Sequence, residues 1–216
     1  AAVLFHWSVD RARVHLTFLP DSPAVFVEAR MLMLIDCGGD RSAEFTVPRH
    51  LRARGVDSFS HLVLTHGVKH HVGGFESVFK SQPLRAVYLS HAKSSSKFHR
   101  SILAELGRKP SLKQIVSAGD TIGPWTVLHP AEEDDFRRST DDAMVLKGRF
   151  HGVRILLLSD LGSSGQQAML ARDADLRAEI LVVSVPDQTS PALSPGLLRE
   201  IQPRVIVLHD SRFPVS

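Results

Sequence analysis

The chain has 216 residues, of which 43% are hydrophobic and 23% are charged, and its formal net charge is +3. This length and composition suit one globular domain with a full core, and the single cysteine excludes an intrachain disulfide scaffold. No apolar run approaches the ~18 residues that a membrane span needs, so the isolated chain is expected to be soluble.

The predicted elements begin with three short strands at 14–19, 24–27 and 31–35, which are rich in β-branched, aromatic and aliphatic residues. A helix is expected over 45–54, with Gly55 as its C-terminal stop. The next elements, in order, are a strand at 62–65, a helical segment at 75–79, a strand at 86–89 and a helix that serines 94–96 can cap and that runs through Leu106.

The second half of the chain repeats this order of strands followed by alternating strands and helices. The patterns predict a strand at 122–128 interrupted by Pro124, an acidic loop at 132–142, paired strands at 143–146 and 153–158, a helix at 162–171, a strand at 180–185, a helix at 194–201 and a strand at 204–208. We therefore expect a single α/β domain over residues 13–216, with sheets inside and helices outside, preceded by an extension or linker at 1–12.

The stretch with the most chemical information joins the strand at 62–65 to a group of histidines. His66, His70 and His71 follow that strand, and the pair Gly73 and Gly74 comes directly after them. A strand that delivers imidazoles into a loop is typical of the way a metallohydrolase presents its metal ligands.

The order of these motifs resembles the metallo-β-lactamase superfamily, and within it the C-terminal domain of the ComEC family of DNA-uptake proteins. The resemblance spans about residues 13–216. It implies a four-layer αβ/βα sandwich with a metal site along one edge of the sheets. It also implies a parent membrane protein that carries this domain outside the cytoplasm. The expected partners are then the membrane channel portion of the same protein and single-stranded DNA.

The framework of the family pattern is kept at four positions. Asp36 lies in the segment that matches Leu-Ile-Asp-x-Gly, and His66 and His71 match the first and last histidines of Thr-His-x-His-x-Asp-His-x-Gly-Gly. Asp160 matches the carboxylate of the family's Gly-Asp, which bridges metal ions. The resemblance therefore makes His71 and Asp160 the candidate catalytic residues.

The other ligand positions of the pattern are substituted. Val68 stands where the family has its second histidine, and His70 stands where it has aspartate. Asp187 and Gln188 replace a pair of histidines, and Val215 replaces the last one. The metal motif is therefore a degenerate copy of the family's motif.

The number of remaining ligands limits the metals that the site can hold. A catalytic zinc usually takes three protein ligands and leaves one position for water. A first metal would keep only His66 and Asp160, whereas a second could use His70, His71, Asp160 and Asp187. The sequence thus favours no metal or one zinc, with manganese as the alternative ion, over a two-metal centre.

A purely structural interpretation of the same residues also stands. The histidines would then be polar residues that line an old cleft, and Asp36 would hold loop amides. Asp160 would cap the helix that begins near Gly162. His209 follows the last strand and would line the same cleft.

Basic residues dominate the segment 85–113, in which only Glu105 is acidic. Such a block can follow a phosphate backbone, although a solvated basic helix face has the same composition. The candidate nucleic-acid contacts are Lys93, Lys97, Arg100, Arg108, Lys109 and Lys113.

Three functions follow from these observations, and the sequence leaves open whether the chain is an enzyme. The lost ligands favour a ComEC-type domain with a degenerate metal centre and a role in handling nucleic acid. The alternative is an active metal-dependent phosphodiesterase or nuclease. A hydrolase of small substrates such as lactones is less well supported, because the basic segment favours a polyanion.

Overall fold

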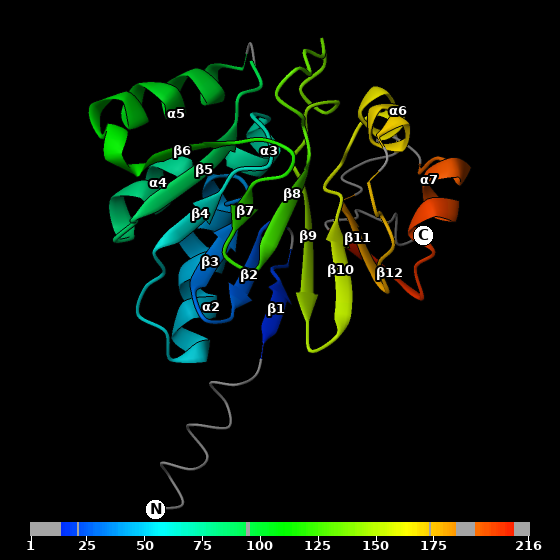
Figure 1. Ribbon diagram of the computed structural model, residues 1–216. Helices are drawn as coiled ribbons and strands as arrows, with labels where there is room; N and C mark the ends of the chain where they lie inside the picture. The colour runs from blue at the N-terminus through cyan, green and yellow to red at the C-terminus, as the bar shows by residue number, and fades with distance from the viewer. Residues whose placement is uncertain (1–13, 21, 94–95, 173, 185–192, 210–216) are drawn as a thin grey trace, which may run out of the picture.

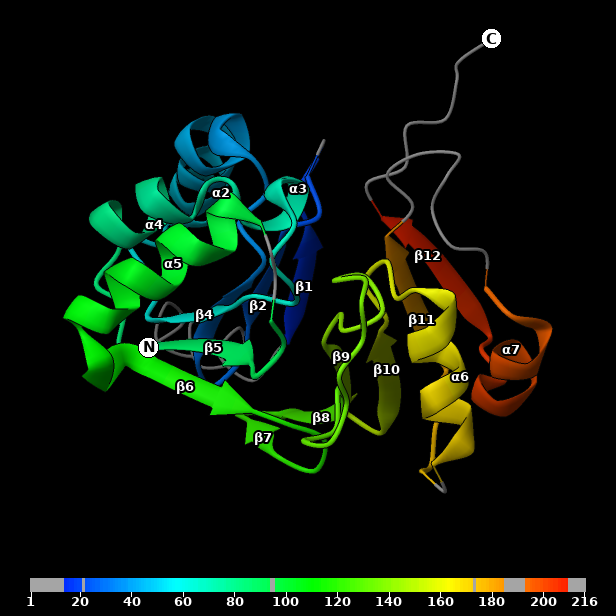
Figure 2. The same cartoon turned by 90° about the horizontal axis from the view of Figure 1, so that it is seen from above.

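The computed structural model describes residues 14–20, 22–93, 96–172, 174–184 and 193–209. Two six-stranded sheets face each other, and helices cover the outer face of each (Figures 1 and 2). The view from above in Figure 2 shows the sequence of layers from helices through both sheets to helices. The four-layer αβ/βα sandwich expected from the sequence is confirmed.

The first sheet is built from the N-terminal half of the chain. Its strands, in spatial order, are β1 (His15–Phe18), β2 (Val25–Glu28), β3 (Leu32–Ile35), β4 (His61–Val63), β5 (Ala86–Ser90) and β6 (Lys113–Val116). The pairs from β1 to β3 are antiparallel, and those from β3 to β6 are parallel. The helical segments of this half are η1 (Ser42–Thr46), α2 (Val47–Arg54), α3 (Lys69–Val72), α4 (Phe75–Ser81), α5 (Lys97–Arg108) and η2 (Pro110–Leu112).

The second sheet comes from the C-terminal half. Its strands, in spatial order, are β12 (Val205–His209), β11 (Ile180–Ser184), β10 (Val153–Leu157), β9 (Val145–Phe150), β8 (Trp125–His129) and β7 (Thr121–Ile122). Helices α6 (Ser163–Ala171) and α7 (Pro195–Ile201) cover its outer face (Figure 1). No helix within the described ranges combines the length and the apolar character needed to cross a membrane.

Alternating side chains along the strands separate the core into layers. In β3, Met33 and Ile35 pack between the two sheets, whereas Leu34 packs toward the helices. Trp125 is fully buried between the sheets, and its ring lies 5.1 Å from that of Phe150. Because successive residues of a strand point to opposite faces, this pattern fixes which side of each strand meets the other sheet.

The structure differs from the predicted elements in several places. Strand β6 was not predicted, and α5 continues past Leu106 to Arg108. The single strand expected at 122–128 is two strands, because Gly123, with a φ of 57°, forms the turn between β7 and β8. The expected stop at Gly55 is confirmed by its left-handed backbone at the C-cap of α2.

Candidate metal centre

The ends of strands from both sheets bring the candidate ligands together. His66 comes shortly after β4 in the first sheet and His71 lies on α3, whereas Asp160 comes shortly after β10 in the second sheet. One donor atom from each of these three side chains lies within 4.8 Å of the other two, and all three residues are buried. Within the described part of the chain, this is the one group of three or more such ligands.

The ligand atoms of the three side chains face one another at the distances of ion pairs. Nε2 of His66 lies 3.1 Å from Oδ1 of Asp160, and Nε2 of His71 lies 3.8 Å from Oδ2. Nevertheless, both Nε2 atoms and Oδ1 of Asp160 are buried and have no hydrogen-bond partner. Buried polar atoms are rarely left in this state, so three of them converging on one point fit a bound cation.

Asp36 orients His71 from behind. Oδ2 of Asp36 lies 2.6 Å from Nδ1 of His71, and both side chains are almost fully buried. A carboxylate can only accept, so Nδ1 donates, and in the neutral ring Nε2 then carries the lone pair that faces Asp160. Metal-binding histidines are commonly held by such a carboxylate on their second nitrogen.

Thr65 orients His66 in a similar way. Its amide donates to Oδ1 of Asp36 over 2.8 Å, and its hydroxyl donates to Oδ2 over 2.7 Å. This uses the only hydroxyl hydrogen, so the Thr65 oxygen accepts from Nδ1 of His66, 3.1 Å away, and from the hydroxyl of Ser159, 3.2 Å away. His66 therefore also presents the lone pair of Nε2 toward Asp160 when its ring is neutral.

The charges of the cluster are coupled. Burial lowers the pKa of His66, but the negative charges of Asp160 and Asp36 outweigh it and hold the pKa above its usual value. Burial raises the pKa of Asp160, but His66 and His71 outweigh it and hold the pKa well below its usual range. Asp160 is thus an ionised carboxylate with a positive charge beside it. That charge is either a proton on a histidine or a metal ion.

His70 does not join the three clustered ligands. It precedes His71 directly on α3, and the two rings lie 5.6 Å apart at 80° to each other. Successive residues of a helix point about 100° apart, so these neighbours cannot both face the same point. Val68, at the N-cap of α3, offers no donor atom. Asp187, also expected as a ligand, lies outside the described residues, as do Gln188 and Val215.

The structural interpretation of the same residues holds in part. Asp36 does hold a loop amide, that of Thr65. The cap expected from Asp160 is wrong, because Oδ1 of Asp141 accepts the amide of Ser164 at the start of α6. His209 lines a cavity of about 30 Å³ together with Asp36, Thr65, His71 and Ser159, among others, as expected for a residue of the cleft.

Sequence reasoning missed the roles of Thr65 and Ser159. The only signal for Thr65 was its place directly before His66. Ser159, with a φ of 56°, has a left-handed backbone that the sequence pattern does not reveal. The contact between the two hydroxyls also joins residues 94 positions apart, so only the packing of the sheets brings them together.

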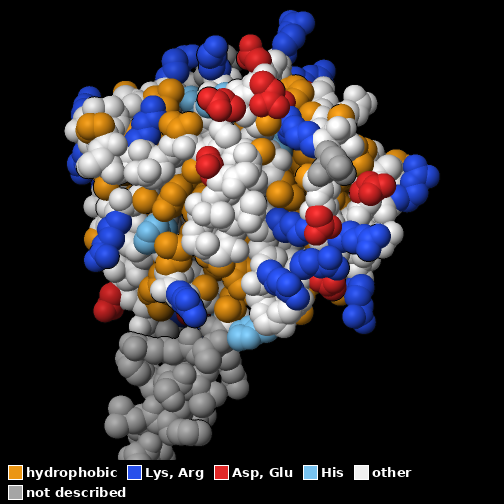
Figure 3. Space-filling model, viewed as in Figure 1, with side chains coloured by type: hydrophobic (Ala, Val, Ile, Leu, Met, Phe, Trp, Pro, Cys, Tyr) orange, Lys and Arg blue, Asp and Glu red, His pale blue; other side chains and the backbone are white. Residues whose placement is uncertain are grey.

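The predicted nucleic-acid residues lie on the α5 side of the molecule. Lys97, Arg100 and Arg108 lie on α5, with Lys109 just beyond it and Lys113 on β6. Lys93 lines a second cavity, which also contacts His66. Figure 3 shows lysine and arginine side chains over this side, but also over the side of the second sheet, and carboxylates at the top of the molecule.

No protein-family model and no curated protein matches this chain. Among solved structures it is similar to a diphosphatase from the PhnP family, with 16% identity and a TM-score of 0.51 over 87% of this chain and 72% of that one. It is also similar to the metallo-β-lactamase MIM-1 from Novosphingobium pentaromativorans, with 16% identity and a TM-score of 0.52 over 74% and 68% of the two chains. The metallo-β-lactamase SMB-1 gives 15% identity and a TM-score of 0.53 over 79% and 76%. The chain therefore has the metallo-β-lactamase fold.

Proposed function

We propose that this chain binds one divalent metal ion, zinc in the first place, through His66, His71 and Asp160, and that it is a metal-dependent hydrolase of phosphate esters. The observation that carries the proposal is the convergence of three buried donor atoms that have no hydrogen-bond partner. Three protein ligands are the usual set of a catalytic zinc, and the remaining position suits water. When bound, such an ion would supply Lewis-acid chemistry and lower the pKa of water to near ~7.

The residues around the ligands support this assignment. Asp36 holds the ring of His71, and Thr65 holds the ring of His66, so both imidazoles are oriented before any ion arrives. Asp160 brings the negative charge that a divalent cation needs, from the opposite sheet. Such supporting hydrogen bonds typically change metal affinity by about 10–100-fold.

Two observations support a phosphate ester as the substrate: the similarity to a diphosphatase and the basic residues of α5. One similar structure is that of a diphosphatase, and Lys97, Arg100 and Arg108 lie on α5. The resemblance to ComEC extends the proposal to nucleic acid, with single-stranded DNA as substrate. Lys93, Lys97, Arg100, Arg108, Lys109 and Lys113 would then contact its phosphates.

The second candidate is a domain of the same type without catalysis, which handles nucleic acid on a membrane channel protein. Val68 offers no donor atom and His70 does not join the cluster, and both observations favour it. In that case the positive charge beside Asp160 would be a proton on His66. The two candidates differ in whether the chain binds metal tightly.

Metal analysis of protein purified without chelator decides between them. We expect about one equivalent of zinc by mass spectrometry, or on titration with zinc or manganese by calorimetry. His71→Ala and Asp160→Ala should each abolish binding, whereas His151→Ala, at an exposed hairpin turn, should not.

Absence of binding at micromolar metal would contradict the hydrolase and leave the second candidate. If zinc binds, hydrolysis of a chromogenic phosphodiester and of single-stranded DNA is measured next. Bound zinc without either activity would contradict the catalytic part of the proposal alone.

A further inference from the structure

A cavity opens beside His66, on the α5 side of the candidate metal centre. Its polar lining consists of His66, Gly67, Ser90, Lys93, His99 and Ser139. Its enclosed part measures about 20 Å³, which is room for about one small polar group, and it continues into open solvent. A group that enters this cavity therefore comes to lie against a candidate metal ligand.

The lining of this cavity suits an anion. It combines an ammonium group, imidazoles and hydroxyls, and no aspartate or glutamate is among the lining residues. These groups donate hydrogen bonds, and bonds from charged donors to phosphate oxygens are among the strongest that proteins form. The rest of the lining is apolar and comes from Leu64, Val72, Leu89, Ala92 and Ile102.

Gly67 allows the wall of the cavity to form. A Cβ atom at this position would lie 2.7 Å from Nδ1 and 2.8 Å from Cβ of His99, closer than real Cβ contacts allow. His99 therefore packs directly on the backbone at residue 67, next to His66. His99 also belongs to the first turn of α5, where the helix dipole favours negative charge.

Two further lysines lie near one ring on α5, next to His99 in the chain. The ammonium groups of Lys69 and Lys97 lie 5.6 Å and 5.3 Å from the centre of the same ring, that of Phe98. Lys69, Lys93 and Lys97 are all exposed. Three like charges on neighbouring elements would be relieved by a bound anion.

We infer that this cavity binds a terminal phosphoryl group of the substrate, and that Lys93, His99 and Ser139 position it beside the metal ligands. The inference rests on the proposed function, because it assigns the substrate contacts of the same site. The enclosed part takes about one oxygen atom of this group, and the open side of the cavity leaves room for the rest. A terminal phosphoryl group offers three free oxygens to these side chains, against two in a phosphodiester, so the inferred substrate class is a phosphomonoester or a nucleic acid with a terminal phosphate.

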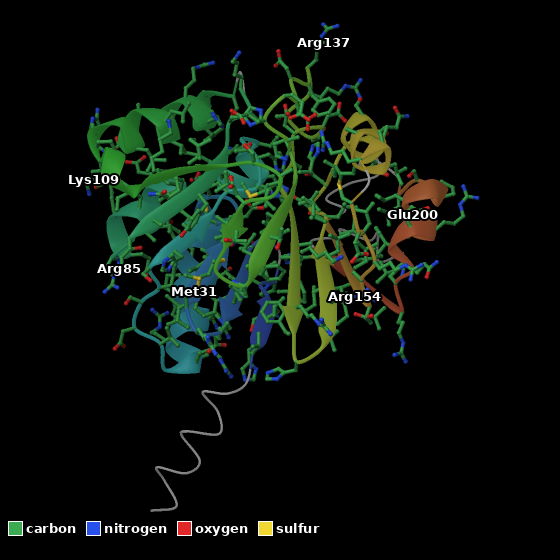
Figure 4. All side chains as sticks on the ribbon, in the orientation of Figure 1. Met31, Arg85, Lys109, Arg137, Arg154 and Glu200 are labelled. Atoms are coloured by element: carbon green, nitrogen blue, oxygen red, sulfur yellow. The ribbon has the colours of Figure 1, made fainter. Side chains whose placement is uncertain are left out.

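The test measures phosphate binding by the full chain, with and without zinc. Inorganic phosphate and a nucleoside 5′-monophosphate are titrated and followed by phosphorus NMR. Lys93→Ala should weaken binding about tenfold, the loss expected for one charge-assisted hydrogen bond. Ser139→Ala should weaken it by a smaller factor. Arg154→Ala is the control, because Arg154 lies on β10 of the second sheet, away from α5 (Figure 4), and pairs with Glu179.

The outcomes separate this inference from the proposed function. No binding of phosphate by the wild type, or equal binding by the wild type and Lys93→Ala, would overturn the inference even if zinc binds. Binding that depends on Lys93 while zinc does not bind would support the phosphoryl site and contradict only the proposed function. Oligonucleotides with and without a 5′-phosphate identify the source: tighter binding of the phosphorylated strand points to nucleic-acid ends, and equal binding points to small esters.

Discussion

At the scale of single residues, Asp36 accepts three hydrogen bonds within one small space. Its carboxylate binds the His71 ring and both the amide and the hydroxyl of Thr65, while its own backbone has a φ of 54°. A left-handed backbone at a non-glycine residue costs about 1 kcal/mol or more, and it persists only where the surroundings enforce it. The three hydrogen bonds hold the Asp36 side chain in place. The same hydrogen bonds therefore stabilise its left-handed backbone and orient the ring of His71.

Asp142 gives a prediction about pH. It is 2% exposed, and its Oδ1 has no hydrogen-bond partner. Burial raises its pKa from 3.8 to about 6, against the opposing effect of His91 and with additions from Asp134, Asp135 and Asp141. Between about pH 4 and pH 6 the folded chain therefore binds more protons here than the unfolded chain, and this residue's contribution to stability falls as pH rises.

Asp142→Asn should therefore raise the free energy of unfolding at neutral pH by ~1–2 kcal/mol and have little effect below about pH 4. Urea denaturation of the variant and the wild type across this range measures the difference. Glu132→Gln removes the same charge from an exposed position of the same loop and should show no such pH window. Equal behaviour of the two variants would contradict the assignment to burial of Asp142.

The sequence predicted part of this site because its motif is local. His66 and His71 follow one strand, and their convergence with Asp160 needed only the expected edge of the sandwich. His70 lies outside the ligand cluster because it is on helix α3, and the sequence pattern did not predict that helix. Contacts such as that of His99 with residue 67 depend on how α5 crosses the sheet, which no spacing in the chain encodes.

At the scale of elements, two glycines should respond oppositely to the same substitution. At Gly74, which precedes α4, a Cβ would lie 2.4 Å from Cβ of Ala43 and 2.8 Å from the carbonyl oxygen of Gly39. At Gly107, exposed on α5, a Cβ would meet nothing within 4 Å. Gly74→Ala should lower the free energy of unfolding by ~1–3 kcal/mol, and Gly107→Ala should raise it by ~0.5–1 kcal/mol.

Urea denaturation of the two variants checks both signs. Stabilisation or no change in Gly74→Ala would mean that η1 and the loop at 36–39 can move away from α4. A loss of stability in Gly107→Ala would be inconsistent with an open helix surface at that position.

Strand prediction succeeded for the buried strand β3 and failed for the edge strand β6. Strand β3 packs on both faces, and its aliphatic run was recognised as a strand. Strand β6 lies at the sheet edge and exposes both Gln114 and Ile115, so its side chains carry no alternating pattern. An edge strand pairs with one neighbouring strand through backbone hydrogen bonds. These bonds do not require a particular pattern of side chains, so the sequence does not reveal them.

At the scale of the whole molecule, the candidate ligands come from both halves of the sandwich. A metal ion held by His66, His71 and Asp160 would therefore link the first sheet to the second. Binding to the folded state alone adds about 2.7 kcal/mol to stability when the free metal is at about 100 times Kd. Zinc should accordingly raise the midpoint of thermal unfolding by several degrees.

Calorimetric melting of the full chain with zinc and with chelator measures this shift. Asp160→Asn keeps the shape of the side chain but removes the charge from the second sheet, so the shift should disappear. Asp120→Asn, at an exposed turn, should keep it. A midpoint that does not respond to zinc in the wild type would mean that no ion links the halves.

The hydroxyl contact between Thr65 and Ser159 joins the same two halves without any ion. Together with Asp36, it ties the rim of the sandwich through groups that the chain itself supplies. These hydrogen bonds link the two halves in addition to any link that a metal ion would supply. A variant that has lost a metal ligand should therefore keep this link between the two halves.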